Sequence, residues 1–183
     1  GVTPRAELAA GAGLAVGNGV VVDERLQTSA PGVFAAGDVA NAHHPLLGRS
    51  IRVEHWATAL EQGPAAARAM LGQVVSYDRV PYFFSDQYDV GMEYSGLADG
   101  ADRLVLRGDP ASREFIAFWL RGPHLLAGMN VNVWDVADTI QALIRSGARV
   151  DDADLADPDV PLTRIAEDAG ATAGAEDFPA GPS

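Results

Sequence analysis

Short apolar runs and one long helical pattern organise the first 76 residues. The β-branched run 19–23 (GVVVD) and the apolar run 32–36 (GVFAA) are each bounded by turn residues, so both predict short strands. Residues 6–10 predict a short helix. An Ala-rich composition and apolar positions three and four apart predict a longer helix over 53–71. We expect an interruption near Gly63-Pro64, because proline removes a backbone donor.

The second half changes to a strand-rich pattern. Residues 77–94 are rich in aromatic side chains and predict a domain connection that runs into a strand. Alternating apolar and polar positions at 103–107, 114–121 and 124–131 are separated by turn residues, which predicts consecutive antiparallel hairpins. Apolar positions at helical spacing then predict a helix over 135–145 that ends at a glycine.

Beyond Val150 the chain becomes small and acidic, with almost nothing to bury. Residues 149–183 hold nine acidic residues and two Arg, which is more than half of the formal net charge of −12. Low hydrophobicity combined with high charge is typical of disorder. We therefore expect residues 167–183 to form a disordered acidic tail.

Composition narrows the class of protein. At 183 residues and 48% hydrophobic content, the chain can form one domain or two small ones. Its acidic balance argues against nucleic-acid binding, and without a long apolar run or a leader-like start we expect a cytoplasmic protein with no membrane span. Zero cysteines exclude a disulfide or an iron–sulfur cluster ligated by this chain. Nothing resembling an initiating strand precedes the first helix, so we expect a piece of a longer protein.

The sharpest chemical signal is the segment 28–40 (TSAPGVFAAGDVA). A strand that ends in Gly37-Asp38 would project one carboxylate from its C-terminal edge, where ligands bind in open α/β sheets. Such a carboxylate accepts hydrogen bonds from sugar or sugar-alcohol hydroxyls. The alternative, which stays open at this point, is that Asp38 caps the N-terminus of the next helix.

Several segments together resemble a known flavoprotein family. Residues 19–38 are similar to the second FAD-binding segment of flavoproteins built from two dinucleotide-binding domains. Two further segments, 52–59 (RVEHWATA, followed by Gln62-Gly63) and 80–89 (VPYFFSDQYD), narrow the resemblance to the FAD-dependent NAD(P)H:ferredoxin reductases of bacterial oxygenase systems. The match covers residues 1–166 of this chain and only the C-terminal part of the family, so most of the NAD(P)H site would lie outside the chain.

The resemblance implies roles for individual residues. It places Asp38 on the flavin ribitol, within the cofactor-binding turn Gly37-Asp38-Val39. It also places the start of the helix with Glu54, His55 and Trp56 at the pyrimidine end of the flavin ring. Structural alternatives stay open: Trp56 as a core residue and His55 as a surface residue. Phe84 corresponds to an aromatic residue near the flavin that is often Trp in relatives. Because Phe lacks the indole N–H, this residue would contact the flavin only by packing.

Further candidates concern partners and metals. Arg49 and Arg52 lie near the expected flavin edge, where they would steer docking of an acidic ferredoxin or rubredoxin; ordinary surface charge is the alternative. His43 and His44 are adjacent in a loop flanked by Pro and Gly, so we expect surface residues and no metal site. No residue of this chain is expected to be catalytic in the covalent or acid–base sense.

The predicted fold is an α/β fragment of a two-dinucleotide-binding-domain flavoprotein, followed by an α+β C-terminal domain with an antiparallel sheet. Residues 1–76 would hold the end of the NAD domain and the returning FAD-binding segment, and 77–166 the C-terminal domain. The expected function is part of an FAD-dependent bacterial oxidoreductase passing electrons from NAD(P)H to ferredoxin or rubredoxin, with the isolated chain inactive. Alternatives are a non-catalytic docking or dimerisation module, an NADH oxidase, or a relative of apoptosis-inducing factor.

Overall fold

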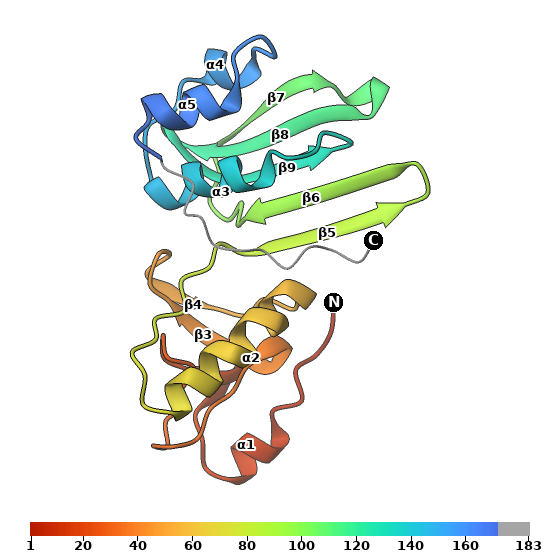
Figure 1. The fold of residues 1–183 in the computed structure, drawn as a ribbon. Coiled ribbons are helices and arrows are strands. Elements are labelled where there is room, and N and C mark those ends of the chain that lie inside the picture. The colour runs from red at the N-terminus through yellow and green to blue at the C-terminus, as the bar shows by residue number, and fades with distance from the viewer. Residues whose placement is uncertain (172–183) are drawn as a thin grey trace. The chain divides into compact units, whose positions relative to one another are not determined.

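The computed structural model describes residues 1–171 and divides the chain into two compact units, Gly1–Phe83 and a second that begins at Phe84. Residues 172–183, where most of the expected tail lies, fall outside the described residues. Each unit is built around its own sheet and helices, most of which Figure 1 labels.

The first unit holds a small mixed sheet of four strands in the order β1-β2-β3-β4. Strand β2 pairs in parallel with β3, with Val20 opposite Ala40 and Val22 opposite Ala42, while β1 and β4 pair antiparallel at the two edges. Its elements are α1 (Glu7–Gly11), β1 (Val16–Gly17), β2 (Gly19–Val22), the 3₁₀ turn η1 (Gly37–Val39), β3 (Ala40–His44), β4 (Arg49–Ile51) and α2 (Trp56–Met70). The strand expected at 19–23 and the helix expected at 6–10 are thereby confirmed.

The core of the first unit lies between the sheet and one face of α2. Small side chains on that face allow close packing: Ala65, Ala66 and Ala69 are buried against Val20 and Val22 of β2. The loop after β2 adds Leu26, which is fully buried. The Ala-rich composition of α2 therefore serves both helix propensity and close approach to the sheet.

Two sequence predictions for this unit are corrected. The apolar run 32–36 is not a strand: its only β-bridge in the described part of the chain pairs Phe34 with Gln27. Local hydrogen bonds from Thr28 N–H to the Val33 carbonyl and from Ala35 N–H to the Leu26 carbonyl fold it into a loop. A β-branched or aromatic run needs a neighbour along its whole length to remain a strand.

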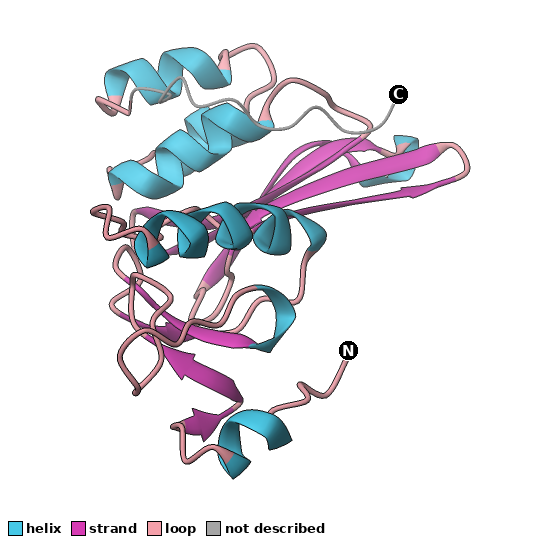
Figure 2. Cartoon of the chain, turned by 60° about the horizontal axis from the view of Figure 1, so that its bottom comes forward, coloured by secondary structure: helices cyan, strands magenta, loops and turns pink. Residues whose placement is uncertain are grey.

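The second correction concerns helix α2, which begins at Trp56 and continues through Pro64 to Met70. Figures 1 and 2 both draw it as one unbroken helix. Pro64 and Gly63 lie on the exposed face, where water can satisfy the carbonyl that a proline leaves without its helical donor. The apolar face continues on both sides of Pro64, so packing outweighs the lost hydrogen bond.

The second unit is a five-stranded antiparallel sheet in the order β5-β6-β9-β8-β7. Strands β7, β8 and β9 are successive neighbours, which confirms the predicted meander. Helix α3 packs on one face of the sheet, where a Cβ at Gly128 of β9 would collide with Ile140. The elements are β5 (Tyr82–Gln87), β6 (Val90–Gly96), β7 (Arg103–Asp109), the 3₁₀ turn η2 (Pro110–Ser112), β8 (Glu114–Arg121), β9 (His124–Val131), α3 (Ala137–Ser146), α4 (Asp152–Ala156) and α5 (Leu162–Asp168).

The segment after Val150 does have a core, contrary to the sequence expectation. Helices α4 and α5 bury Leu155, Leu162 and Ile165. Arg107 of β7 donates to the carbonyls of Pro158 and Val160, which holds the α4–α5 loop against the sheet. A short helix needs only a narrow stripe of apolar residues on one face to pack against the rest of the unit. An acidic segment with such a stripe can therefore still fold.

Candidate functional site

The turn that carries Asp38 lies directly before β3. Gly37 is buried and adopts a φ of 75°, which favours glycine, and the carboxylate of Asp38 is exposed. No apolar strand ends at Asp38 and no helix starts there, since η1 leads straight into β3. Both sequence interpretations of the Asp38 geometry are therefore corrected: the carboxylate projects from a 3₁₀ turn.

Arg52 joins this turn to the segment before α2. Its Nη1 donates to the backbone carbonyl of Asp38 at 3.0 Å and to Oε2 of Glu54 at 2.8 Å. Its Nε donates to Oδ1 of Asn18 at 3.0 Å, and its side chain is only 10% exposed. The hydrogen bond from Arg52 lowers the pKa of Glu54. Arg52 therefore braces the site from within and presents little of its surface for direct contact.

Among residues 1–171, no side-chain hydrogen bond caps the N-terminus of α2. His55 occupies the N-cap position in extended conformation without a side-chain cap, and the first turn contains no acidic residue. Glu54 and His55 thus precede the helix, and only Trp56, which is 54% exposed, belongs to it. A 15-residue helix has a positive dipole end at its N-terminus, which can accept an electron-rich group of a ligand.

His55 adds a buried polar atom to the same place. Its Nδ1 is buried and has no hydrogen-bond partner within residues 1–171, while its ring packs on Phe83 with centroids 4.5 Å apart. Burial lowers the pKa of His55, although the nearby carboxylates of Glu54 and Asp38 act in the opposite direction. Because the ordinary pKa of histidine is already below 7, this lowering keeps His55 neutral at pH 7.

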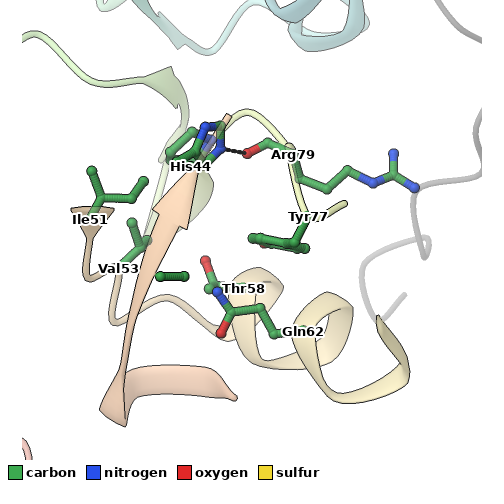
Figure 3. Close-up of a pocket in the computed structure, with 9 residues that line it drawn as sticks. His44, Ile51, Val53, Thr58, Gln62, Tyr77 and Arg79 are labelled. Carbon is green, nitrogen blue, oxygen red and sulfur yellow. Dashed lines mark hydrogen bonds between the residues drawn. The ribbon is translucent and has the colours of Figure 1, made fainter. Parts of the chain in front are cut away.

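A small cavity lies beneath this site, between β3 and α2. Figure 3 shows His44, Thr58, Gln62 and Tyr77 around it, with His44 bonded to the carbonyl of Arg79 at 2.8 Å. The cavity measures about 10 Å³, which is close to the space that one water molecule needs. His44, expected at the surface, is 1% exposed because it is the last residue of β3 and points between the sheet and the connecting segment.

The site residues predicted from sequence fall into two groups. Arg52 links Asp38 to Glu54, and His55 follows Glu54 directly in the chain, all within the first unit. Gly37 and Val39 complete the turn. Arg49 is exposed on β4, and Phe84, 40% exposed, begins the second unit. Sequence analysis assigned no role to Gln62, although it lies within the segment 52–63. In the structure, its side chain accepts a hydrogen bond from the Gly37 N–H. No local sequence pattern indicates that contact.

Two kinds of site are not seen among residues 1–171. No group of three or more His, Asp or Glu side chains is placed to hold a metal ion. No helix in this range is both long and apolar enough to cross a membrane.

Two protein families match the chain, one in each half. Residues 1–63 match the pyridine nucleotide-disulphide oxidoreductases, and residues 82–166 match the reductase C-terminal family. The boundary between the matches lies close to the division between the two units at Phe83 and Phe84.

Individual relatives agree with these families. The chain is 39% identical over 165 residues to putidaredoxin reductase of Pseudomonas putida, covering 90% of this chain and 39% of that protein. It is 41% identical over 163 residues to the ferredoxin–NAD(+) reductase component of an anthranilate 1,2-dioxygenase system of Burkholderia cepacia, covering 88% of this chain and 40% of that protein. The chain thus spans about two fifths of the length of these curated relatives.

The three-dimensional comparison agrees. The solved covalent complex of putidaredoxin reductase with putidaredoxin superposes with a TM-score of 0.88 at 38% identity, covering 94% of this chain and 41% of that one. The two family matches, the relatives and the shared fold lead to one conclusion: the chain belongs to the pyridine nucleotide-disulphide oxidoreductase family and carries a reductase C-terminal domain.

Proposed function

We propose that this chain forms part of an FAD-dependent reductase that passes electrons from NAD(P)H to a ferredoxin or rubredoxin. The observation that carries the proposal is the junction of the Asp38 turn with the uncapped N-terminus of α2, which Arg52 and Glu54 hold together. The relatives named as ferredoxin–NAD(+) and putidaredoxin reductases support the same activity.

The residues present fit a flavin. An exposed carboxylate at Asp38 suits the hydroxyls of the ribityl chain, since hydrogen bonds to a charged group contribute about 1.5–3 kcal/mol. The positive dipole end at the start of α2 suits the oxygen-bearing edge of the ring. The φ of 75° at Gly37 favours glycine and shapes the turn that presents Asp38.

The chain's own residues would then shape the electrostatics of the cofactor. When bound, FAD supplies the conversion between a two-electron hydride donor and a one-electron acceptor. The positive end of α2 favours negative charge at the ring edge next to it. His55 stays neutral near pH 7 and so adds no second positive charge. Trp56, more than half exposed, would shield the ring from solvent.

Partner recognition is the second part of the proposal. Arg49 is exposed on β4 and would contact an acidic redox partner directly, whereas the enclosed Arg52 would contribute through its electric field. The solved complex of putidaredoxin reductase with putidaredoxin supports a partner of this kind. Phe84 would pack near the flavin, and most of the NAD(P)H site would lie in residues outside this chain.

The proposal extends to organisation and source. We assign residues 1–76 to the end of the NAD domain and the returning FAD-binding segment, and 77–166 to the C-terminal domain; the matches over 1–63 and 82–166 support this order. The Pseudomonas and Burkholderia relatives support a bacterial source. We place the enzyme in the cytoplasm, where NAD(P)H is available.

The test is flavin retention. In the reductase that contains this chain, Asp38→Ala should weaken FAD binding by about 10-fold to 100-fold, because one charge-assisted hydrogen bond is lost. Flavin content is measured from the visible spectrum after desalting. Glu24→Ala, which removes an exposed carboxylate on a loop of the same unit, is the control and should retain the flavin. Equal flavin content in both variants would contradict the role of Asp38.

A further inference from the structure

A buried amide holds the turn that carries Asp38. Gln62 lies on α2, is 4% exposed, and accepts a hydrogen bond from the Gly37 N–H at 2.8 Å across a sequence separation of 25 residues. Gly37 is itself buried, so this N–H has no access to bulk water. A buried backbone donor without an acceptor would be costly, and Gln62 removes that cost.

The chemistry of the contact also fixes the orientation of the amide. The Gly37 N–H can only donate, so the atom of Gln62 that meets it must be the oxygen Oε1. Thr58 lies one turn earlier on α2, on the same face, and both side chains line the cavity in Figure 3. Gln62 is therefore held between the cavity and the turn.

We propose that Gln62 is a positioning residue for the flavin: by accepting the Gly37 N–H, it holds η1 in the conformation that presents the Asp38 carboxylate. The turn is then fixed from two sides. Gln62 binds its first residue, and Arg52 binds the carbonyl of its second. This inference rests on the proposed function, since it names a residue that acts on the cofactor site through the turn.

A neutral acceptor suits this place better than a charged one. A carboxylate at the buried position of Gln62 would lose hydration, and a shorter side chain would not reach from α2 to the turn. The amide reaches the turn and carries no charge, which explains why a polar residue occupies the buried face of an otherwise Ala-rich helix.

The first experiment measures hydrogen exchange of the Gly37 amide in the full 183-residue chain. Gln62→Met removes the acceptor at similar side-chain length, and Gly37 exchange should become at least tenfold faster while the amides of Val21 and Ala42, in β2 and β3, change little. Thr58→Val alters the same cavity without removing the acceptor and should leave Gly37 protected. Uniform acceleration at all three amides, or no change at Gly37, would overturn the proposal.

The second experiment measures the FAD dissociation constant of the intact reductase. We expect about a tenfold increase for Gln62→Met and little change for Thr58→Val. An unchanged dissociation constant for Gln62→Met would refute the positioning role, whereas a wild-type enzyme that binds no FAD would refute the proposed function itself. The two failures are thus distinguishable.

A second variant covers the case in which Gln62→Met does not fold. Gln62→Glu keeps an acceptor oxygen in the same place, so the Gly37 amide proton shift should follow the titration of the new carboxyl group. A Gly37 shift that is independent of pH in this variant would overturn the proposal.

Discussion

Single residues in the first unit connect segments that lie far apart in the sequence. Arg52 contacts Asn18, Asp38 and Glu54, and Gln62 contacts Gly37. The motifs identified Asp38, Glu54, His55 and Trp56 as candidates from residue type and order. They did not indicate which of these side chains hydrogen-bond to one another. A hydrogen-bond partner from a distant segment depends on the tertiary fold.

The titration of His55 is the first residue-scale prediction. Burial lowers its pKa below the ordinary 6.5, so the folded chain holds this proton less tightly than the unfolded chain does. The stability contribution of neutral His55 is present above pH 6.5 and is lost as the pH falls through the folded pKa. NMR titration of the ring should give a midpoint below 6.5. A midpoint for His55 at or above 6.5 would contradict the assignment.

A glycine pair gives the second residue-scale prediction. Gly19 has a φ of 100° and a Cβ there would collide with the Val39 carbonyl, whereas Gly13 has a φ of 77° and open space around it. We expect Gly13→Ala to cost about 1 kcal/mol of unfolding free energy from the backbone conformation alone. Gly19→Ala should cost at least about 3 kcal/mol, because the collision adds to it. Urea unfolding measures both, and equal losses would show that the turn at Gly19 adapts.

At the scale of elements, packing decides where local propensity is ambiguous. Pro64 predicts a helix break, yet α2 continues because its buried face is uninterrupted. The run 32–36 predicts a strand, yet it folds as a loop because only one bridge supports it. By contrast, the β7–β8–β9 meander was predicted correctly, since its pairings join consecutive segments through short turns.

Helix α2 provides an element-scale prediction. Pro64→Ala restores a helical N–H on the exposed face, so it should raise the unfolding free energy of the first unit by about 1–2 kcal/mol, after the gain in unfolded-state entropy is subtracted. The control is Pro110→Ala, since Pro110 is the first residue of η2 and suits its place. Circular dichroism during thermal unfolding measures both variants. A destabilised Pro64→Ala would mean that the exposed carbonyl needs no helical donor.

Helix α4 provides a second element-scale prediction. Leu155 is fully buried, so Leu155→Ala should lower the unfolding free energy of the second unit by about 2–5 kcal/mol. Leu104 on β7 is 51% exposed, and Leu104→Ala should cost less than about 1 kcal/mol. Denaturant unfolding compares the two. Similar small losses would show that the segment after Val150 contributes no core, as its acidic composition alone suggests.

At the scale of the whole molecule, the chain consists of two units with separate cores. The first is formed by Val20, Val22 and Leu26 with the alanines of α2, and the second by Phe118, Leu120, Ile140 and Leu143. Each core is built from residues of its own unit. The two units unfold in one cooperative transition only if the stability of one core depends on the other. Cores built from separate residues favour separate unfolding transitions.

We therefore expect two transitions in calorimetry of the 183-residue chain. Leu155→Ala should lower only the transition of the second unit, and Val22→Ala, in a position 3% exposed, only that of the first. Each variant acts as the control for the other. A single transition that both variants shift equally would show that the two units unfold as one.

The sequence by itself determined the order of the main elements, the antiparallel meander, the helices over α1, α2 and α3, and the family resemblance that singled out Asp38. These follow from local patterns of hydrophobicity, turn residues and motifs, which need only neighbouring positions. Only the tertiary structure decided that 32–36 is a loop, that His44 is buried, that α4 and α5 have a core, and that Gln62 holds Gly37. Each of these features depends on a partner from a distant segment of the chain. The free energy gained by pairing or burial comes from both partners together, so neither segment alone reveals it.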